Sequence, residues 1–163
     1  MTTGKQAHLE SAREIRAELF ALLDGMDYCL DWKQDPDEWS ARDMVYHILD
    51  TPPGGVHSLI NGILSGEVRE YELWSDLTNV TPERAGYDMV QVNADIESFF
   101  QGLDLALSGA SDEDLETKTV MMHQKSQGFD EERTVTSILD RTLGVHIRGH
   151  LTQLRELRDA LGL

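Results

Sequence analysis

Apolar residues recur along this chain at alternating spacings of three and four, which is the spacing of one face of an α-helix. The pattern returns in separate stretches over residues 6–30, 40–64, 85–106 and 134–162. No stretch sustains the period of two that a half-buried strand requires. We therefore expect an all-α protein, in which four amphipathic helices bury their apolar stripes against one another as a four-helix bundle. The clearest stripe is Ala85, Met89, Val92, Ile96, Phe99, Leu103 and Ala106.

The second helix is predicted to be broken. Ser40 has the position of its N-cap, Asp43 that of the acidic partner in a capping box, and Trp39 with Met44 that of a hydrophobic staple. The sequence 51–55, Thr-Pro-Pro-Gly-Gly, then interrupts the helix, because proline disfavours helical geometry in the residue before it. A second apolar segment resumes at Val56 and ends before Gly66.

The other boundaries follow from capping and turn residues. The first helix is expected over 6–30, and the third begins at Thr81 and Pro82 and ends at Ser108-Gly109. Thr134 would cap the fourth, and Gly162 stands where a C-terminal glycine belongs. Residues 67–80 then form a long polar crossover, whose Tyr71, Leu73 and Trp74 would seal one end of the core. Residues 110–133 are irregular, with an extended stretch as an option near 117–122. No linker or repeat divides the chain, so residues 1–163 are expected to form a single domain.

Composition excludes several classes of function. Fourteen basic against thirty acidic residues give a net charge of −16, which repels nucleic acid and anionic membrane surfaces. The chain has one cysteine, Cys29, no apolar run long enough to span a bilayer and no signal-peptide core at its start. These features predict a cytoplasmic protein.

Two histidines stand four residues apart in the last helix. His146 and His150 fall on the apolar stripe that also contains Leu139, Leu143 and Leu154. Side chains four apart on one helical face lie about 5–6 Å apart at Cβ, so both imidazoles could reach one ion at about 2.0–2.1 Å. The pair is thus expected to form a chelate in the interior seam of the bundle.

His47, one turn after Met44, is predicted to face inward from the second helix. Three neutral imidazoles around one ion leave at least one coordination position open, as in catalytic divalent sites. The alternative is that these are core histidines whose nitrogens bond backbone carbonyls or water. Position 147 is isoleucine, so the His-Glu-x-x-His pattern of zinc proteases is absent.

Four further polar residues could approach this site. Asp50 could accept the free ring N–H of His47, and Gln153 could support His150. His57 lies beyond the helix break, and His123 lies in the long segment before the fourth helix; both are expected to be outside the ligand set, although either could approach the site. His8, near the N-terminus, is assigned no role, and no residue is assigned a catalytic one.

Several short motifs together resemble the DinB/YfiT-like superfamily of metal-binding four-helix bundles, the DNA-damage-inducible family that is unrelated to the polymerase of the same name. They are Trp39-Ser40 before the helix of His47, and His146-x-x-x-His150-x-x-Gln153 running to Leu161-Gly162. The resemblance implies a divalent ion, typically zinc or nickel, held by His47, His146 and His150. It also implies a homodimer, and characterised relatives include transferases and an isomerase that depend on low-molecular-weight thiols.

Three functions remain open from the sequence. The first is a metal-dependent enzyme acting on a small molecule, either a transferase that uses a low-molecular-weight thiol or a hydrolase, with the ion activating thiol or water. The second is a non-catalytic stress-response protein that binds a metal or small ligand. The third is a dimerisation bundle without metal, in which all three histidines stay unligated.

Overall fold

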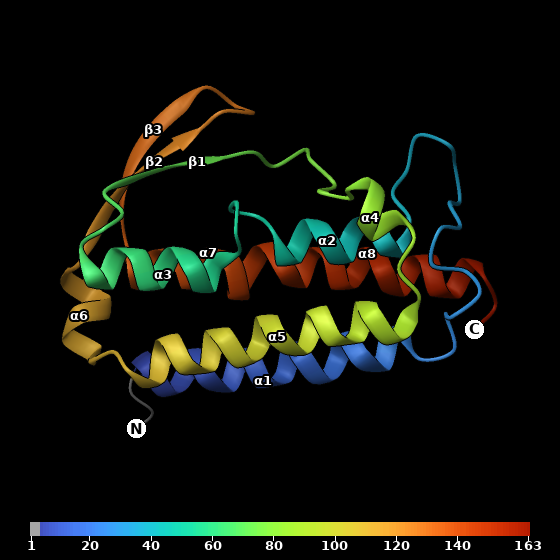
Figure 1. Ribbon diagram of the computed structural model, residues 1–163, viewed down its shortest axis with the longest axis horizontal. Coiled ribbons are helices and arrows are strands. Elements are labelled where there is room, and N and C mark those ends of the chain that lie inside the picture. The colour runs from blue at the N-terminus through green and yellow to red at the C-terminus, as the bar shows by residue number, and fades with distance from the viewer. Residues whose placement is uncertain (1–3) are drawn as a thin grey trace.

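The structure is a computed structural model that describes residues 4–163, and it is mostly helical with one small sheet. Its helices are α1 (Gly4–Leu23), α2 (Ala41–Leu49), α3 (Val56–Ser65), α4 (Pro82–Ala85), α5 (Met89–Ser108), α6 (Asp112–Thr117), α7 (Val135–Arg141) and α8 (Ile147–Ala160), with a π-helical segment (Thr142–His146) between α7 and α8. Its strands are β1 (Glu70–Leu73), β2 (Thr119–Gln124) and β3 (Phe129–Thr134). In Figure 1, α1 and α5 lie side by side and face α2, α3, α7 and α8 across the core. No helix in residues 4–163 is long and apolar enough to cross a membrane.

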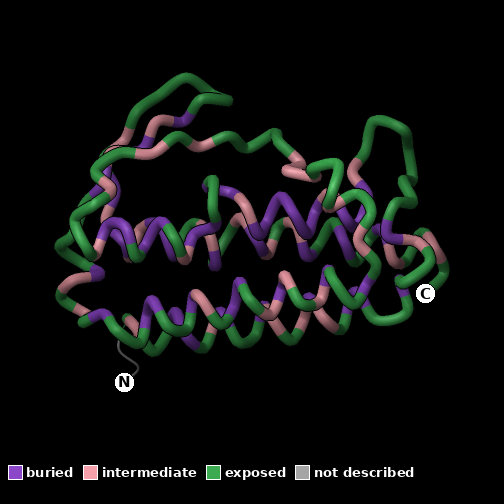
Figure 2. Tube along the Cα trace, in the orientation of Figure 1, coloured by how far each residue is buried: buried purple, intermediate pink, exposed green. Residues whose placement is uncertain are grey.

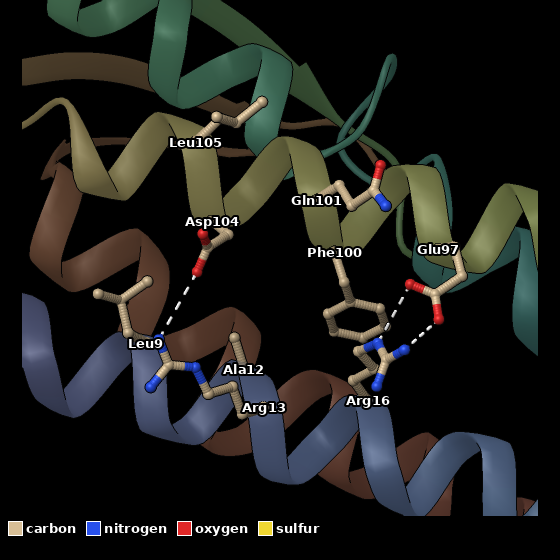
Figure 3. A pocket seen from close by; sticks show the side chains of 9 residues that line it. All are labelled: Leu9, Ala12, Arg13, Arg16, Glu97, Phe100, Gln101, Asp104 and Leu105. Atoms are coloured by element: carbon tan, nitrogen blue, oxygen red, sulfur yellow. Dashed lines mark hydrogen bonds and ion pairs between the residues drawn. The ribbon is translucent and has the colours of Figure 1, made fainter.

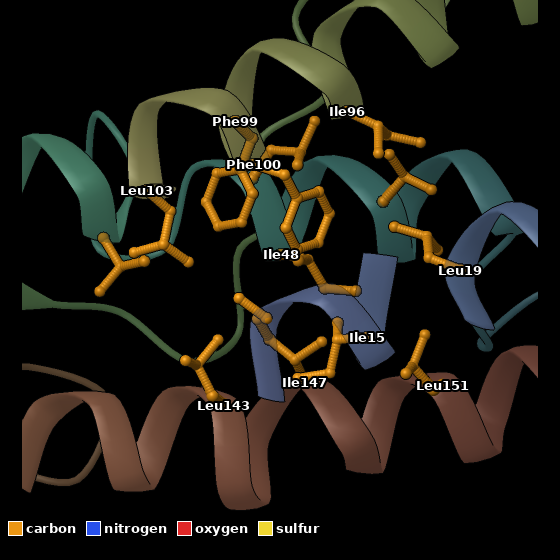
Figure 4. Packing of buried hydrophobic residues seen from close by; sticks show 14 of the residues in the cluster. Ile15, Leu19, Ile48, Ile96, Phe99, Phe100, Leu103, Leu143, Ile147 and Leu151 are labelled. Carbon is orange, nitrogen blue, oxygen red and sulfur yellow. The ribbon is translucent and has the colours of Figure 1, made fainter. Parts of the chain in front are cut away.

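Buried residues recur along each of the long helices (Figure 2). Figure 4 shows how they meet: Ile15 and Leu19 come from α1, Ile96 and Leu103 from α5, and Ile147 from α8. All five are fully buried. Burying one such side chain contributes about 1.5–3 kcal/mol relative to leaving it exposed, so these interlocking stripes supply much of the stability of the bundle.

The second helical stretch follows the predicted signals closely. The Ser40 hydroxyl accepts the Asp43 N–H and the Asp43 carboxylate accepts the Ser40 N–H, which completes the capping box. The helix ends at Leu49, and α3 begins at Val56. Gly55 between them has φ +89°, and a Cβ there would lie 2.8 Å from the carbonyl oxygen of Leu49. Glycine is therefore required at this turn.

The first and third helices differ from the prediction. The first ends at Leu23 rather than Leu30, because Gly25 adopts φ +80° and turns the chain. Met26 and Leu30, which extend the apolar periodicity of the sequence, are buried at the end of the core but lie outside the helix. The predicted third helix is split: α4 stops at Ala85, and α5 starts anew after Asp88, which forms its own capping box with Gln91.

The prediction of an all-α protein was wrong in one part, because β1, β2 and β3 form a sheet in that order. β1 pairs parallel with β2, with Tyr71 opposite Met122, and β2 pairs antiparallel with β3, with Val120 opposite Arg133. β1 lies in the predicted polar crossover, and its partner is about fifty residues away in sequence, so local periodicity could not reveal it. Tyr71 packs against the core as expected, whereas Trp74 is exposed and does not cover the end of the core.

The last helical stretch has the predicted ends. The Thr134 hydroxyl accepts the Ser137 N–H at the start of α7. At the end of α8, Gly162 at φ +78° donates to the Asp159 carbonyl and Leu163 donates to the Arg158 carbonyl. This pair of bonds is a Schellman motif, which satisfies carbonyls that the helix leaves free.

His8 has a more defined environment than its place near the N-terminus suggests. Its side chain is buried, its Nε2 has no hydrogen-bond partner, and its Nδ1 lies 3.8 Å from a carboxylate oxygen of Asp140. Burial lowers the pKa of His8, and the carboxylates of Asp140 and Asp112 offset this only in part.

We expect the His8→Leu variant to lose stability less steeply than the native protein as the pH falls. Because the pKa of His8 is lower in the folded than in the unfolded chain, the unfolded chain binds more protons below the ordinary pKa of about 6.5. His8 therefore favours the fold above that pH, and this contribution is lost as the pH falls. The free energy of unfolding in urea should therefore fall less steeply between pH 7 and pH 5 in His8→Leu than in the native protein. The two slopes of free energy against pH should differ by at most about 1.4 kcal/mol per pH unit. Equal slopes would contradict the prediction.

Candidate metal centre

Three histidine side chains from two separate parts of the chain converge on one point. Nε2 of His146 lies 2.9 Å from Nε2 of His47 and 3.1 Å from Nε2 of His150. His47 is fully buried on α2, whereas His146 ends the π-helical segment and His150 lies one turn into α8; both of these are half-buried. The structure thus brings together the three residues that the sequence singles out.

The π-helical segment decides where the last two histidines point. The Ile147 N–H donates to the Thr142 carbonyl, five residues back, so this turn contains one more residue than an α-helical turn. Since an α-helix advances about 100° per residue, the extra residue turns everything after it by roughly a quarter of a turn. The buried stripe consequently passes through Ile147 and Leu151 instead of the histidines. His146 and His150 lie beside the core seam, not in it as predicted, and face His47.

Hydrogen bonds fix the protons on two of the rings. Nδ1 of His47 lies 2.6 Å from the Leu77 carbonyl oxygen, which can only accept, so this nitrogen carries the proton. Nδ1 of His150 likewise donates to Oε1 of Gln153 at 2.8 Å. In the neutral rings, both Nε2 atoms therefore present lone pairs toward His146. A single proton on His146 cannot satisfy both, whereas a cation between the three rings can.

All three imidazoles are held neutral at pH 7. Burial lowers the pKa of His47, and it lowers that of His146 to about 4, with His150 and His47 adding repulsion of a positive charge. Burial also lowers the pKa of His150, which the Gln153 contact offsets only in part. Neutral imidazole is the form that binds a metal ion.

The supporting residues differ in part from those expected. Gln153 holds His150, in the position predicted for it. Asp50 does not orient His47, because its carboxylate accepts the Gly54 N–H at 2.8 Å and pairs with Arg84 at 2.9 Å. The Leu77 carbonyl takes that role. A backbone group carries no side-chain signal, so the sequence could not identify it.

Two nearby side chains complete the support of the site. The Thr51 hydroxyl lies 3.2 Å from Nδ1 of His47. The Trp39 ring stacks at 5.8 Å on His150 and lies 4.8 Å from His47, centroid to centroid. The sequence places Trp39 in the helix staple and in the DinB/YfiT-like motif, and the structure adds that its ring lies against His47 and His150.

The other two histidines lie elsewhere. His57 packs edge-on against Phe99 at 5.3 Å and against Gly102 on α5, in the interface of α3 with α5. His123 is on β2 rather than in a loop, and its Nδ1 lies 2.7 Å from Asp130 on β3. Neither residue belongs to the group whose ligand atoms meet, which contains His47, His146 and His150 among the described residues.

The donor set fits a divalent ion with an open position. Ligand nitrogens at about 2.0–2.1 Å from a tetrahedral ion are separated by about 3.3 Å. The two separations to Nε2 of His146, 2.9 and 3.1 Å, are close to this value, and the ligand atoms of all three histidines lie within 4.8 Å of one another. Two cavities of about 440 and 420 Å³ flank the cluster, the first lined in part by His146 and the second by His150, and Ser75 borders both. A ligand could therefore approach the three histidines from either side.

Comparison with known proteins supports the fold. No family model and no curated protein matches the sequence. Among solved structures, the chain is similar to YfiT from Bacillus subtilis, described as a probable metal-dependent hydrolase with an unusual four-helix bundle topology. The match has a TM-score of 0.68 at 18% identity and covers 97% of this chain and 87% of that one. The expectation drawn from the DinB/YfiT-like motifs is thus confirmed for the architecture: this chain has the fold of YfiT.

Proposed function

We propose that this protein is a metal-dependent enzyme that binds one divalent ion, zinc or nickel, through His47, His146 and His150. The observation that carries the proposal is the pair of lone pairs, on Nε2 of His47 and of His150, that face His146 with at most one proton among them. His47, His146 and His150 would hold the ion, which would supply Lewis-acid chemistry that makes a water or thiol nucleophilic at neutral pH.

The chain itself contributes position and environment. The Leu77 carbonyl and the Gln153 side chain orient the rings of His47 and His150, so little rearrangement is needed when the ion binds. Burial keeps the imidazoles unprotonated, and Trp39 shields one side of them from water. The two adjoining cavities leave room for a small-molecule substrate.

Two reaction classes are compatible with this centre. Hydrolysis, with water as the nucleophile, is favoured by the likeness to YfiT. Transfer to a low-molecular-weight thiol is the second class and is implied by the DinB/YfiT-like resemblance.

A non-catalytic metal- or ligand-binding stress protein is the alternative function. It is favoured by one observation: Asp50, the carboxylate that the sequence places nearest to His47, is engaged by Arg84 and Gly54 instead. In that case the ion would mainly tie α2 to α8.

The experiment is to load the protein separately with zinc and nickel, remove excess ion by gel filtration and measure metal by elemental analysis. We expect about one ion per chain, in line with a single three-histidine cluster. The loaded protein is then screened with activated esters alone and with 1-chloro-2,4-dinitrobenzene plus cysteine or glutathione, using chelator-treated protein as the control. Metal-dependent turnover in the first screen supports hydrolysis, and in the second, thiol transfer. A loaded but inert protein would favour the binding alternative, and absence of metal would overturn both.

We further propose that residues 1–163 act as a single domain, in the cytoplasm, and as a homodimer. The dimer follows from the resemblance and is checked by sedimentation equilibrium of the metal-loaded protein. A monomer at all concentrations would contradict the proposed dimer without affecting the metal site.

A further inference from the structure

The cavity beside His146 has an arrangement of charge that the metal centre does not explain. Its volume is about 440 Å³, within the range of small-molecule pockets, and it lies between the sheet and α7. Leu73, Ile138 and Val145 give it an apolar wall, and Arg133 and Arg141 also line it. It therefore combines an apolar surface, two guanidinium groups and one histidine of the centre.

The two arginines are held together by one carboxylate. Arg133 donates to Oε2 of Glu131 from Nε at 3.2 Å and from Nη2 at 3.1 Å, and Arg141 donates to Oε1 at 3.1 Å. Glu131 itself does not line the cavity, and neither does any other acidic residue of the described chain. Two positive charges against one negative leave this wall with a net positive charge, in a protein whose total charge is −16.

Arg133 is also fixed by its surroundings. Its side chain is only 8% exposed, and its Nη1 lies 3.5 Å from the Tyr71 hydroxyl, another lining residue. A buried guanidinium with donors left over for a ligand is suited to bind a carboxylate through two hydrogen bonds. The cluster joins β1, β3 and α7, which is why the sequence does not reveal it.

Other cavities lack this character. The one beside His150 is lined by Glu38 and Glu156, and by no Lys or Arg of residues 4–163. The groove between α1 and α5 (Figure 3) contains two arginines, but each faces its own carboxylate, Arg13 with Asp104 and Arg16 with Glu97. An anion would thus be attracted to the His146 side of the centre and repelled from the His150 side.

We propose that the cavity beside His146 binds a small organic carboxylate, whose carboxylate group contacts Arg133 and Arg141 and whose apolar body lies along Ile138 and Val145. The proposal rests on the proposed function only in assigning the end of the ligand near His146 as the reacting end. The cavity beside His150, which Glu38 and Glu156 line, would repel the same carboxylate group. The two arginines would therefore select a carboxylate as substrate and also determine which of its ends lies toward the histidines.

Benzoate and its uncharged analogue benzamide provide the test, because they have nearly the same shape. Isothermal titration calorimetry on zinc-loaded and metal-free protein should show benzoate binding at least about tenfold more tightly than benzamide in both forms. Arg133→Gln and Arg141→Gln should reduce this preference to less than about threefold. Arg155→Gln is the matched control: Arg155 is 51% exposed and paired with Glu18, as Arg141 is 55% exposed and paired with Glu131, but it does not line the cavity.

Elemental analysis of every variant separates the two proposals. Arg141→Gln keeps the test available if the buried Arg133→Gln variant does not fold. A preference for benzoate that persists in both arginine variants, or that appears only with zinc and does not depend on the arginines, would place the carboxylate on the ion and overturn this proposal. Absence of any preference would overturn it as well. An arginine-dependent preference in a protein that takes up no zinc would instead leave the carboxylate site standing and remove the proposed metal function.

Discussion

Replacing His146 with alanine is expected to abolish stoichiometric zinc binding. Its Nε2 is the atom that lies within 2.9 and 3.1 Å of both other Nε2 atoms, so its loss leaves two ligands of the three. Removing residues that merely support a ligand typically lowers metal affinity about 10–100-fold, so losing a ligand itself should lower it by more than about 100-fold. Competition with a chromophoric chelator measures this directly, and His47→Ala and His150→Ala should behave alike.

His57→Ala and His123→Ala serve as controls, because neither side chain reaches the cluster. Both should retain about one zinc per chain. The native protein should also gain about 4 kcal/mol of stability when free zinc exceeds its dissociation constant about 1,000-fold, a gain that the three ligand variants lose. If His146→Ala bound zinc as tightly as the native protein, the proposed centre would be wrong.

Deleting Gly149 is expected to prevent cooperative folding, whereas deleting Gly144 is expected to be tolerated. Both glycines are exposed and have nothing within 4 Å of an added Cβ, and neither has a side chain, so the two deletions remove no side-chain packing. Gly149 lies in regular α-helix, where its loss turns the following residues by about 100°. Gly144 lies in the π-helical turn, where its loss leaves an ordinary α-helical turn and the same direction beyond it.

The difference in stability between the two deletion variants depends on the buried side chains that the Gly149 deletion would rotate out of the core. Leu151, Leu154 and Leu157 are each at most 3% exposed. Removing one buried leucine side chain costs about 2–5 kcal/mol. Displacing three of them would therefore cost about as much as the 5–15 kcal/mol by which a typical domain is stable. Circular dichroism during urea unfolding should show a cooperative transition for the Gly144 deletion and none for the Gly149 deletion. Equal behaviour of the two would mean that the π-helical turn does not set the direction of α8.

Much of the helical architecture was predictable, because its signals are local. The capping box of Ser40 and Asp43, the N-cap at Thr134 and the glycine at position 162 act on groups within a few residues of themselves. The three histidines could also be singled out, since imidazoles at apolar positions of helical stripes are unusual. A local signal can mislead as well: the stripe that continued to Leu30 did not carry the first helix past Leu23.

The sequence by itself determined where the long helices of the bundle lie and which imidazoles could act together, because backbone capping and apolar periodicity depend on neighbours along the chain. The short helix α6, in a segment expected to be irregular, was missed. Only the tertiary structure decided that a π-helical turn moves His146 and His150 out of the core seam, that the Leu77 carbonyl orients His47, and that β1 pairs with β2. It also placed Arg133 and Arg141 around one cavity. These features depend on residues far apart in sequence packing at native density, where the direction of each side chain is set by all its neighbours together.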